Sequence, residues 1–451
     1  MKKVLNKNDI IELSIDALSS EGSGIGRHEG MAIFVPDTAI GDKLLARILK
    51  VNKTYAYAKV EKHIEASPDR VEPDCNVHSC GGCVYRHISY EAELRAKEQS
   101  VRDAFRRIGG FNLESEPIVG SPEVNRYRNK VQLPVSMADG KAFCGFFSPR
   151  SHRVVPVSDC LLQPEIFTEI CAVIMDFVNQ NKISVYDEKT GRGLLRHIYL
   201  RRGFHTGEIM LSLVCTKETK LFDRLVATLV EKFPEIRTVL LNINSANTNV
   251  ILGSKDICLY GSGTIRDTMC GVSVEISPHS FYQVNTEAAE NVYHAARDFL
   301  GLDGTETLLD LYCGIGTVGL SMAKSVRKLI GIEIVPAAIE NARRNAEMNG
   351  ITNAEFFAGD AGTVAEELSC KGIKPDIVIV DPPRRGCDNE TLTAIARMYP
   401  KKLVYISCNP ATCARDLNIL SKSDYELVRY KPFDMFPRTA HVETISLLKL
   451  K

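Results

Sequence analysis

The sequence predicts an α/β protein in which a Rossmann-like domain follows an OB-like β-barrel and a mostly β central domain. Three observations support this fold class. Short apolar runs separated by Gly-rich turns fill residues 8–62, as in a small closed barrel. Strand-like runs predominate from about 118 to 265. After about residue 285 strand and helix patterns alternate, which is typical of a parallel sheet with helices on both faces.

The chain of 451 residues is too long for one ordinary core, since domains average about 150 residues. The changes in pattern place the expected barrel at residues 1–62, the central domain at 63–265 and the Rossmann-like domain at 266–451. Apolar residues at helical spacing over 89–108 predict a surface helix with one buried stripe. The C-terminal domain is a candidate packing partner for this helix. Further helices are expected at 164–180 and 218–232.

Composition favours a folded protein of the cytoplasm without membrane contact. Hydrophobic residues make up 44% and charged residues 25%, while runs of about 18 apolar residues and a cleavable apolar start are both absent. The 56 basic and 56 acidic residues balance, which argues against a surface coated for nucleic acid. Basic residues nevertheless gather over 126–130, 150–153 and 192–202, so a basic groove remains compatible with this balance.

A glycine pattern marks the expected cofactor site. The run LDLYCGIGTVGL ends a strand in Gly314-x-Gly316-x-x-Gly319, and Glu333 closes the next strand. Glycines let the backbone approach a ligand closely, and an acid at the end of the second strand suits the two hydroxyls of a ribose. This pattern fits NAD and S-adenosylmethionine equally well.

Two later strands end in reactive residues. PDIVIV ends at Asp381 of DPPRRG, and KKLVYIS ends at Cys408 of SCNP. Because ligands of a doubly wound sheet bind at the carboxyl ends of its strands, Gly314, Glu333, Asp381 and Cys408 are expected to meet in one crevice. The Asp381 carboxylate suits either a cationic sulfonium or a uracil imide.

A thiolate beside a methyl donor suits alkylation of an unreactive ring carbon. C5 of uracil becomes nucleophilic once a thiolate such as Cys408 adds at C6, and a base must then remove the C5 proton. Cys413, five residues on, falls at the start of the following helix and is expected to be a packing residue.

The chain resembles the bacterial RNA uracil-C5 methyltransferases over nearly its whole length, and its layout is most similar to that of members acting on 23S ribosomal RNA. The motifs that carry the resemblance are FYQVN (281–285), DLYCGIGT (310–317), GIEIV (331–335), DPPRRG (381–386), SCNP (407–410) and FPRTAHVET (436–444).

The resemblance implies a Rossmann-like S-adenosylmethionine methyltransferase domain that converts uridine of 23S rRNA to 5-methyluridine. In it Cys408 matches the nucleophile, and Glu443 matches the base that takes the C5 proton. The positions similar to S-adenosylmethionine contacts are Gln283, Tyr312, Thr317, Glu333, Asp360 and Asp381. The T-loop uridine of tRNA is the alternative substrate. An NAD-dependent oxidoreductase is disfavoured by DPPRRG and SCNP, and a non-catalytic RNA-binding iron-sulfur protein is a third class.

Four cysteines suggest a metal centre. Cys75, Cys80 and Cys83 lie within nine residues of one another, and Cys160 offers a fourth thiol. Four thiolates suit zinc or a [4Fe-4S] cluster, and spacing does not choose between them. The resemblance implies [4Fe-4S] on these four residues, although the first gap is four residues where the family usually has five. His78 and His87 are further candidate zinc ligands, so a zinc site remains an alternative. Methyl transfer needs no redox centre, so a structural cluster is expected.

The N-terminal barrel resembles a TRAM domain, which implies an RNA partner. OB-type barrels bind single strands through basic grooves and stacking aromatic rings. The residues of that kind here are Lys43, Arg47, Lys50, Lys53, Tyr55 and Tyr57. Addition at C6 requires an unstacked or flipped uridine, and the basic stretches at 126–130 and 192–202 are candidates for holding phosphates. No membrane contact and no obligate protein partner are inferred.

Overall fold

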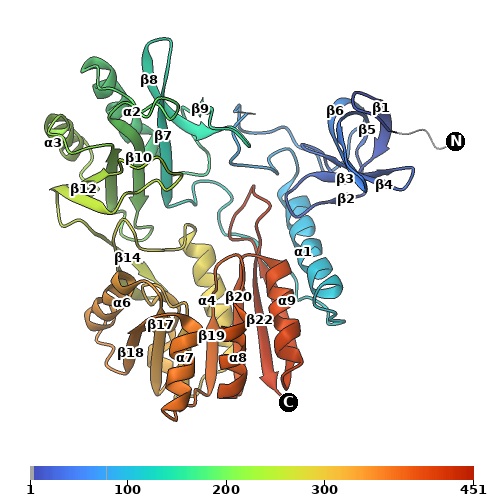
Figure 1. Cartoon of the computed structure of the whole chain (residues 1–451), viewed down its shortest axis with the longest axis vertical. Helices are drawn as coiled ribbons and strands as arrows, with labels where there is room; N and C mark the ends of the chain where they lie inside the picture. Colours follow the sequence, from blue (N-terminus) through green and yellow to red (C-terminus); the bar gives the residue numbers. More distant parts are fainter. Residues whose placement is uncertain (1–4, 78) are drawn as a thin grey trace.

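The barrel predicted at the N-terminus is present. The computed structural model describes residues 5–77 and 79–451, and within them the strands form three large sheets and one separate hairpin (Figure 1). The barrel strands follow the order β1-β5-β6-β4-β3-β2, and alternate side chains such as Ile33, Leu44 and Ile48 are fully buried inside. The strands are β1 (Ile10–Ser14), β2 (Ala17–Leu18), β3 (Gly24–His28), β4 (Met31–Val35), β5 (Lys43–Val51) and β6 (Tyr55–Glu65).

A second sheet fills the central region, with strands in the order β13-β12-β11-β10-β7-β8-β9. Its elements are β7 (Lys130–Ala138), β8 (Lys141–Phe147), β9 (Val154–Pro156), α2 (Glu165–Gln180), β10 (Leu195–Arg202), β11 (Ile209–Cys215), α3 (Asp223–Lys232), β12 (Ile236–Ile243) and β13 (Lys255–Tyr260). Helix α3 begins five residues later than predicted, because the Thr219 hydroxyl accepts the amide of Leu221 in a local turn. A hairpin of β14 (Ile265–Met269) and β15 (Val272–Ile276) follows.

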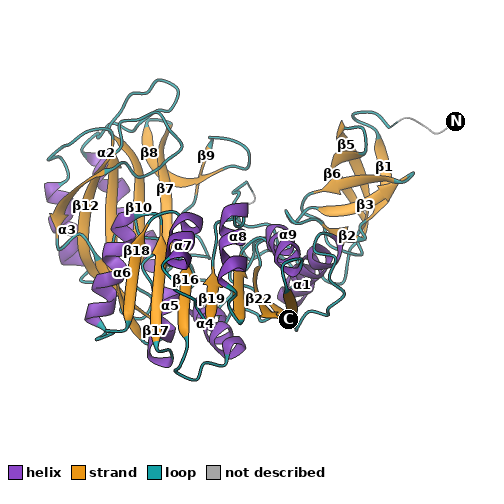
Figure 2. Cartoon of the chain, turned by 60° about the horizontal axis from the view of Figure 1, so that its bottom comes forward, coloured by secondary structure: helices purple, strands orange, loops and turns teal. Residues whose placement is uncertain are grey.

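The C-terminal sheet has seven strands in the order β18-β17-β16-β19-β20-β22-β21, of which β22 runs antiparallel to β20 and β21 (Figure 2). Its strands are β16 (Thr307–Leu311), β17 (Lys328–Glu333), β18 (Ala354–Ala358), β19 (Ile377–Val380), β20 (Lys402–Ser407), β21 (Tyr425–Phe433) and β22 (Glu443–Leu450). The helices are α4 (Thr286–Leu300), α5 (Thr317–Met322), α6 (Pro336–Met348), α7 (Ala361–Cys370), α8 (Asn389–Met398) and α9 (Pro410–Ser421), with a short 3-10 turn at Ala323–Ser325.

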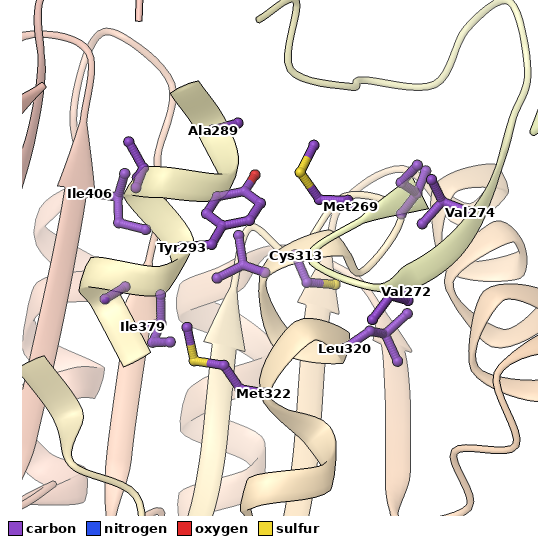
Figure 3. Packing of buried hydrophobic residues seen from close by; sticks show 14 of the residues in the cluster. Met269, Val272, Val274, Ala289, Tyr293, Cys313, Leu320, Met322, Ile379 and Ile406 are labelled. Carbon is purple, nitrogen blue, oxygen red and sulfur yellow. The ribbon is translucent and has the colours of Figure 1, made fainter. Parts of the chain in front are cut away.

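Helices cover both faces of this sheet, as the alternating pattern predicts. Residues of α4, α5, α6 and the β14–β15 hairpin share one apolar cluster with one face of the sheet. Figure 3 shows Met269 of the hairpin between Tyr293 of α4 and Val274, with Cys313 below them in this view. Residues of α7, α8 and α9 pack on the other face. The strand ends where the site is predicted therefore belong to a sheet that is buried on both faces.

Helix α1 (Tyr90–Arg107) lies within the predicted range 89–108 and packs against α9 and β21 of the C-terminal sheet (Figure 1). The Phe105 ring stacks on Tyr430 with ring centroids 4.1 Å apart, and Val101 is fully buried in the same cluster. The helix thus belongs to the core of the C-terminal sheet, although the central region separates the two in sequence. Within residues 5–77 and 79–451, each helix is too short or too polar to cross a membrane.

Candidate active site

The glycine-rich turn after β16 leaves room for a ligand. Gly316 has φ 87°, and a Cβ there would lie 2.9 Å from the side chain of Leu320, so a larger residue does not fit. The Gly319 amide donates to Asp310 Oδ2 at 2.9 Å, which ties the turn to its strand. By contrast, a Cβ on Gly314 would have no atom within 4 Å. The backbone at Gly314 therefore faces open space that a cofactor can fill.

Two acids stand at the ends of neighbouring strands beside this turn. Glu333 ends β17, and its carboxylate accepts the amides of Gly314 at 3.2 Å and Val335 at 3.0 Å. Asp360 follows β18 and caps α7 by accepting the Thr363 amide at 3.0 Å. Each half-buried carboxylate keeps acceptor capacity, so the pair suits the ribose and base of S-adenosylmethionine.

The opposite wall of the crevice comes from α4 and the segment before it. The buried Tyr293 lies near the side chains of Thr317 and Gln283, so two predicted cofactor contacts lie beside one tyrosine. Asn129 Nδ2 in turn donates to the Gln283 carbonyl at 2.8 Å. Sequence reasoning missed Tyr293, although its place in the helical pattern that follows the FYQVN motif offered a weak signal.

Tyr312 is a further predicted cofactor contact. It has φ 66° in the turn after β16, and its hydroxyl donates to Thr391 Oγ1 of α8 at 3.3 Å. A left-handed tyrosine is unusual and persists only where its surroundings hold it. Its half-buried ring therefore lies between the glycine turn and α8.

Cys408 and Glu443 come together because β20 and β22 are antiparallel neighbours. Ser407 pairs with Thr444, so the next position along β20 brings Cys408 beside Glu443. Asp381, at the end of β19, lies close enough that its charge acts on both. Cys408 is half-buried, whereas only 4% of Glu443 is exposed. A thiol and two carboxyl groups thus share the predicted crevice.

Electrostatics keep this thiol protonated in the free protein. Burial raises the pKa of Cys408 to about 11, and the Glu443 and Asp381 charges act in the same direction. The Arg384 guanidinium opposes them through its charge and a hydrogen bond to the thiol. Burial also raises the pKa of Asp381 to about 7 and that of Glu443 well above its ordinary value. The Asp381 carboxyl group can therefore exchange a proton near neutrality, and the Glu443 carboxyl group holds a proton more strongly than an ordinary glutamate does.

Arg384 is held by residues that sequence reasoning did not single out. Its Nη2 donates to His441 Nε2 at 3.1 Å, while its carbonyl accepts Asn409 Nδ2 at 3.0 Å. Burial, followed by the charge of Arg384, lowers the pKa of His441 to about 4, so the imidazole is a neutral acceptor. Both partners lie inside the SCNP and FPRTAHVET motifs, but only the fold shows that they meet Arg384.

Cys413 is separate from this chemistry, as the sequence predicts. It lies on α9, has no exposed surface, and its sulfur faces Ser446 Oγ at 3.9 Å. Burial raises its pKa above the ordinary range of a thiol. Such a thiol acts as a small apolar residue.

Removing the buried negative charge of Asp381, which lies near the carboxyl group of Glu443, is expected to stabilise the protein at alkaline pH. The pKa of Asp381 rises from 3.8 to about 7 on folding, so its stability contribution is complete below pH 3.8 and is lost as pH rises through 7. Asp381→Asn should therefore raise the free energy of unfolding at pH 8 by about 1–3 kcal/mol, and with it the unfolding temperature by a few degrees. At pH 4 both increases should be much smaller. Thermal unfolding at both pH values tests this, and an equal change at both would contradict it.

The four predicted metal ligands border one cavity of about 340 Å³, which Cys75, Cys80, Cys83 and Cys160 line together with Arg86. Burial raises the pKa of Cys160 to about 11, and neighbouring thiols contribute. Within residues 5–77 and 79–451, however, no three His, Cys, Asp or Glu side chains are arranged to hold a metal ion. The four thiols around one cavity are of the donor type that binds zinc or an iron-sulfur cluster.

One of the two proposed histidine ligands, His87, borders the same cavity as the four cysteines. His87 points one ring nitrogen at the Thr38 carbonyl, 3.1 Å away, which occupies that nitrogen. His78 lies outside the described residues. The second ring nitrogen of His87 remains available, and the zinc alternative stays a prediction.

The basic stretches divide into buried and available residues. The guanidinium groups of Arg196 and Arg201 are buried and donate to backbone carbonyls, so the expectation that they hold phosphates is wrong. Arg126 is paired with Asp159 at 2.7 Å. Lys130 differs, because burial and the charges of Arg201 and Arg128 lower its pKa to about 8.

On the barrel, two predicted RNA contacts are already paired. Lys43 bonds Glu65 at 2.5 Å and Arg47 bonds Glu61 at 2.7 Å, both at the surface. Phe34, Tyr55 and Tyr57 instead form a group of half-buried rings on β4 and β6, with centroids 5.5–5.8 Å apart. Aromatic groups of this kind suit stacking on bases.

The sheet order, the glycine turn after β16 and the acids after β17 and β18 define an S-adenosylmethionine-dependent methyltransferase fold. Residues 89–451 match the family described as tRNA (Uracil-5-)-methyltransferase, and residues 5–60 match the TRAM domain. The chain therefore belongs to the RNA uracil-C5 methyltransferase family, whose reaction is S-adenosylmethionine-dependent methylation of C5 of uracil in RNA.

Similar proteins agree with this family. A protein of Halalkalibacterium halodurans described as an uncharacterized RNA methyltransferase is 41% identical over 450 residues, which is 99% of this chain and 98% of that protein. One of Clostridium tetani with the same description is 42% identical and covers 99% and 98%. The crystal structure of Pyrococcus abyssi tRNA (uracil-54, C5)-methyltransferase with S-adenosyl-L-homocysteine has a TM-score of 0.77 and 30% identity, covering 97% of this chain and 100% of that one.

Proposed function

We propose that Cys408 is the nucleophile and Glu443 the general base of uracil-C5 methylation. The observation that carries this proposal is their meeting at the adjoining ends of β20 and β22, beside Asp381. A thiol, a buried carboxyl group and a cofactor turn in one crevice are the groups that this reaction requires.

The reaction begins when the Cys408 thiolate adds to C6 and the C5–C6 pair becomes an enolate. S-adenosylmethionine supplies the methyl group that this enolate takes at C5. The carboxylate of Glu443 then accepts the C5 proton, the C5–C6 double bond forms again, and the thiolate leaves. Because burial holds the pKa of Cys408 near 11, thiolate formation depends on Arg384 and on the loss of charge at Asp381.

The cofactor is proposed to contact six residues around the glycine turn. Gly314 leaves space where a side chain would otherwise stand, and Asp310 Oδ1 is buried without a hydrogen-bond partner among the described residues, so polar capacity remains beside the open turn. The proposed contacts are Gln283, Tyr312, Thr317, Glu333, Asp360 and Asp381.

We infer that the substrate is one or two uridines of 23S rRNA. The resemblance in layout to the ribosomal members of the family supports this choice. The likeness to the Pyrococcus abyssi enzyme, which acts on uracil 54 of tRNA and matches 97% of the chain, supports tRNA as the second candidate. Either RNA places the enzyme in the cytoplasm.

Mapping of 5-methyluridine by mass spectrometry in rRNA and tRNA from a strain lacking the gene tests the substrate. Loss of one or two methyl groups from 23S rRNA, restored by the native gene, is the expected result. Loss confined to tRNA would transfer the assignment to the T-loop uridine. Unchanged 5-methyluridine in both RNAs would contradict the proposed function.

The RNA is proposed to approach over the barrel and the mouth of the crevice. Phe281, two residues before Gln283, is 67% exposed and offers a ring on which an unstacked base can lie. The ring group of Phe34, Tyr55 and Tyr57 offers a second stacking surface on the barrel. These aromatic groups replace the paired Lys43 and Arg47 as the proposed RNA contacts.

A [4Fe-4S] cluster held by Cys75, Cys80, Cys83 and Cys160 is the proposed occupant of the cysteine cavity. It would tie the loop before α1 to the segment before α2, a structural role. Anaerobically purified protein should contain iron and acid-labile sulfide in equal amounts, and Cys160→Ser should lower both. Protein that retains zinc but no sulfide would contradict the cluster. Loss of methylation on oxidation, with fold and RNA affinity intact, would contradict a purely structural role.

A further inference from the structure

The connection between β21 and β22, residues 434–442, is buried to an unusual degree. Asp434 and Met435 are each 1% exposed, and Thr439 and Val442 are also buried. Connections normally lie on the surface, because buried polar groups of the backbone need partners. This connection, here called the base loop, leads directly into Glu443. Its partners therefore decide where the proposed base stands.

An ion network on α1 holds the start of the base loop. Lys97 is 2% exposed and its Nζ donates to Glu93 Oε1 at 2.7 Å, to Asp434 Oδ1 at 2.6 Å and to the Phe436 carbonyl at 3.1 Å. A lysine ammonium has three donors, so all are used. The hydroxyl of Tyr90 donates to Asp434 Oδ2 at 2.9 Å. Figure 1 shows α1 beside the strands that this loop joins.

The middle of the base loop is held from two sides at Arg438. Its amide donates to Glu93 Oε1 at 2.7 Å, and its guanidinium lies 3.5 Å from Glu93 Oε2. Its carbonyl accepts the amides of Val84 at 2.8 Å and Tyr85 at 3.3 Å, the two residues that follow Cys83. Arg438 has φ 68°, a conformation that a non-glycine residue keeps only where its surroundings impose it.

These contacts connect α1 and the cysteine loop to the active site. Glu443 follows the base loop, and His441 within the loop holds Arg384 next to Cys408. Lys97 and Glu93 bond to the loop itself, at Asp434 and Arg438, so the loop is their path to the reacting groups. A side chain that fixes this loop therefore acts on the chemistry through Glu443 and His441.

We propose that Lys97 and Glu93 are positioning residues for removal of the C5 proton, because together with the Val84 and Tyr85 amides they set the base loop that carries Glu443. This inference rests on the proposed role of Glu443. A base that is displaced slows proton removal more than it slows thiol addition or methyl transfer, since those earlier steps use Cys408 and the cofactor turn. The methylated covalent adduct on Cys408 should then accumulate.

Lys97→Met tests the proposal, because it keeps a long buried side chain and removes all three donated hydrogen bonds. The substrate is total RNA labelled with [5-³H]uridine from the deletion strain. In a single turnover, with the protein in excess over the target uridines, tritium release should fall about tenfold or more, while methyl transfer to the RNA, adduct included, falls less and a denaturant-stable protein–RNA adduct appears. Glu93→Gln keeps an acceptor for the Arg438 amide, so this variant should accumulate less of the adduct than Lys97→Met does. Tyr90→Phe provides a further variant if Lys97→Met does not fold.

Arg107→Met is the matched control. It breaks the exposed ion pair with Asp103, which lies on the same helix and has the same four-residue spacing as Glu93 and Lys97. This variant should react as the native protein does. Rates are normalised to the fraction that binds S-adenosylhomocysteine, so loss of folded protein does not count as loss of chemistry.

Two outcomes would overturn the inference. In one, folded Lys97→Met releases tritium at the native rate. In the other, tritium release and methyl incorporation fall equally and no adduct forms, as a general structural role would give. A native protein that neither methylates this RNA nor forms an adduct with 5-fluorouridine RNA would instead overturn the proposed function.

Discussion

Cys408→Ala is expected to abolish methylation, by on the order of 10⁴-fold or more, while binding of S-adenosylhomocysteine persists. The reason is that no other thiol stands at the strand end beside Glu443 and Asp381 in the described part of the chain. Without the addition at C6, C5 of uracil is not nucleophilic. Methyl incorporation into RNA of the deletion strain and a cofactor-binding titration measure the two properties separately. The variant should also fail to form a covalent adduct with 5-fluorouridine RNA.

Cys413→Ala is the control in the same segment. Its thiol is fully buried on α9, so the variant should lose some stability but keep methylation within about threefold of the native rate. Equal loss of activity in both variants would point to damage of the β20–α9 turn. An adduct that persists in Cys408→Ala would assign the nucleophile to another residue.

The sheet and its cofactor turn could be predicted because their signals are local. Gly314, Gly316 and Gly319 lie within one short run, and the strand that ends at Glu333 follows soon after. The parallel strands are short apolar runs that alternate with helical patterns, so their carboxyl ends were expected to meet. The helix of residues 90–107 was predicted as a surface helix with one buried stripe, although the partner of that stripe was left open.

Contacts between distant segments could not be predicted in the same way. Lys97 and Asp434 are 337 residues apart, and nothing in either neighbourhood indicates a buried ion network. The pairing of Arg384 with His441 likewise depends on the route of the base loop. The basic stretch at 192–202 misled for a related reason, since charge in a sequence does not show whether a guanidinium group faces solvent or backbone carbonyls.

Charge at the site explains how a crevice assembled from three strands can hold a nucleophile. The charges of Asp381 and Glu443 raise the pKa of Cys408, but the Asp381 carboxyl group, whose pKa is raised to about 7, can carry a proton near neutrality. A protonated carboxyl group no longer opposes thiolate formation. The charge of Arg384 then opposes the charge of Glu443 at the thiolate, and a uracil that excludes water strengthens the interaction of Arg384 with the thiolate.

Glu443→Gln is expected to stop the reaction after methyl transfer. The amide cannot accept the C5 proton, so turnover should fall by about 10²–10⁴-fold while the methylated adduct on Cys408 accumulates. Removing the Glu443 charge also removes one cause of the raised pKa of Cys408, so the first addition should be no slower and should extend to lower pH. Denaturing gels with RNA and methyl-labelled cofactor measure the adduct. Glu443→Gln protein that turns over at the native rate, or that is inactive without any adduct, would show that another group takes the proton.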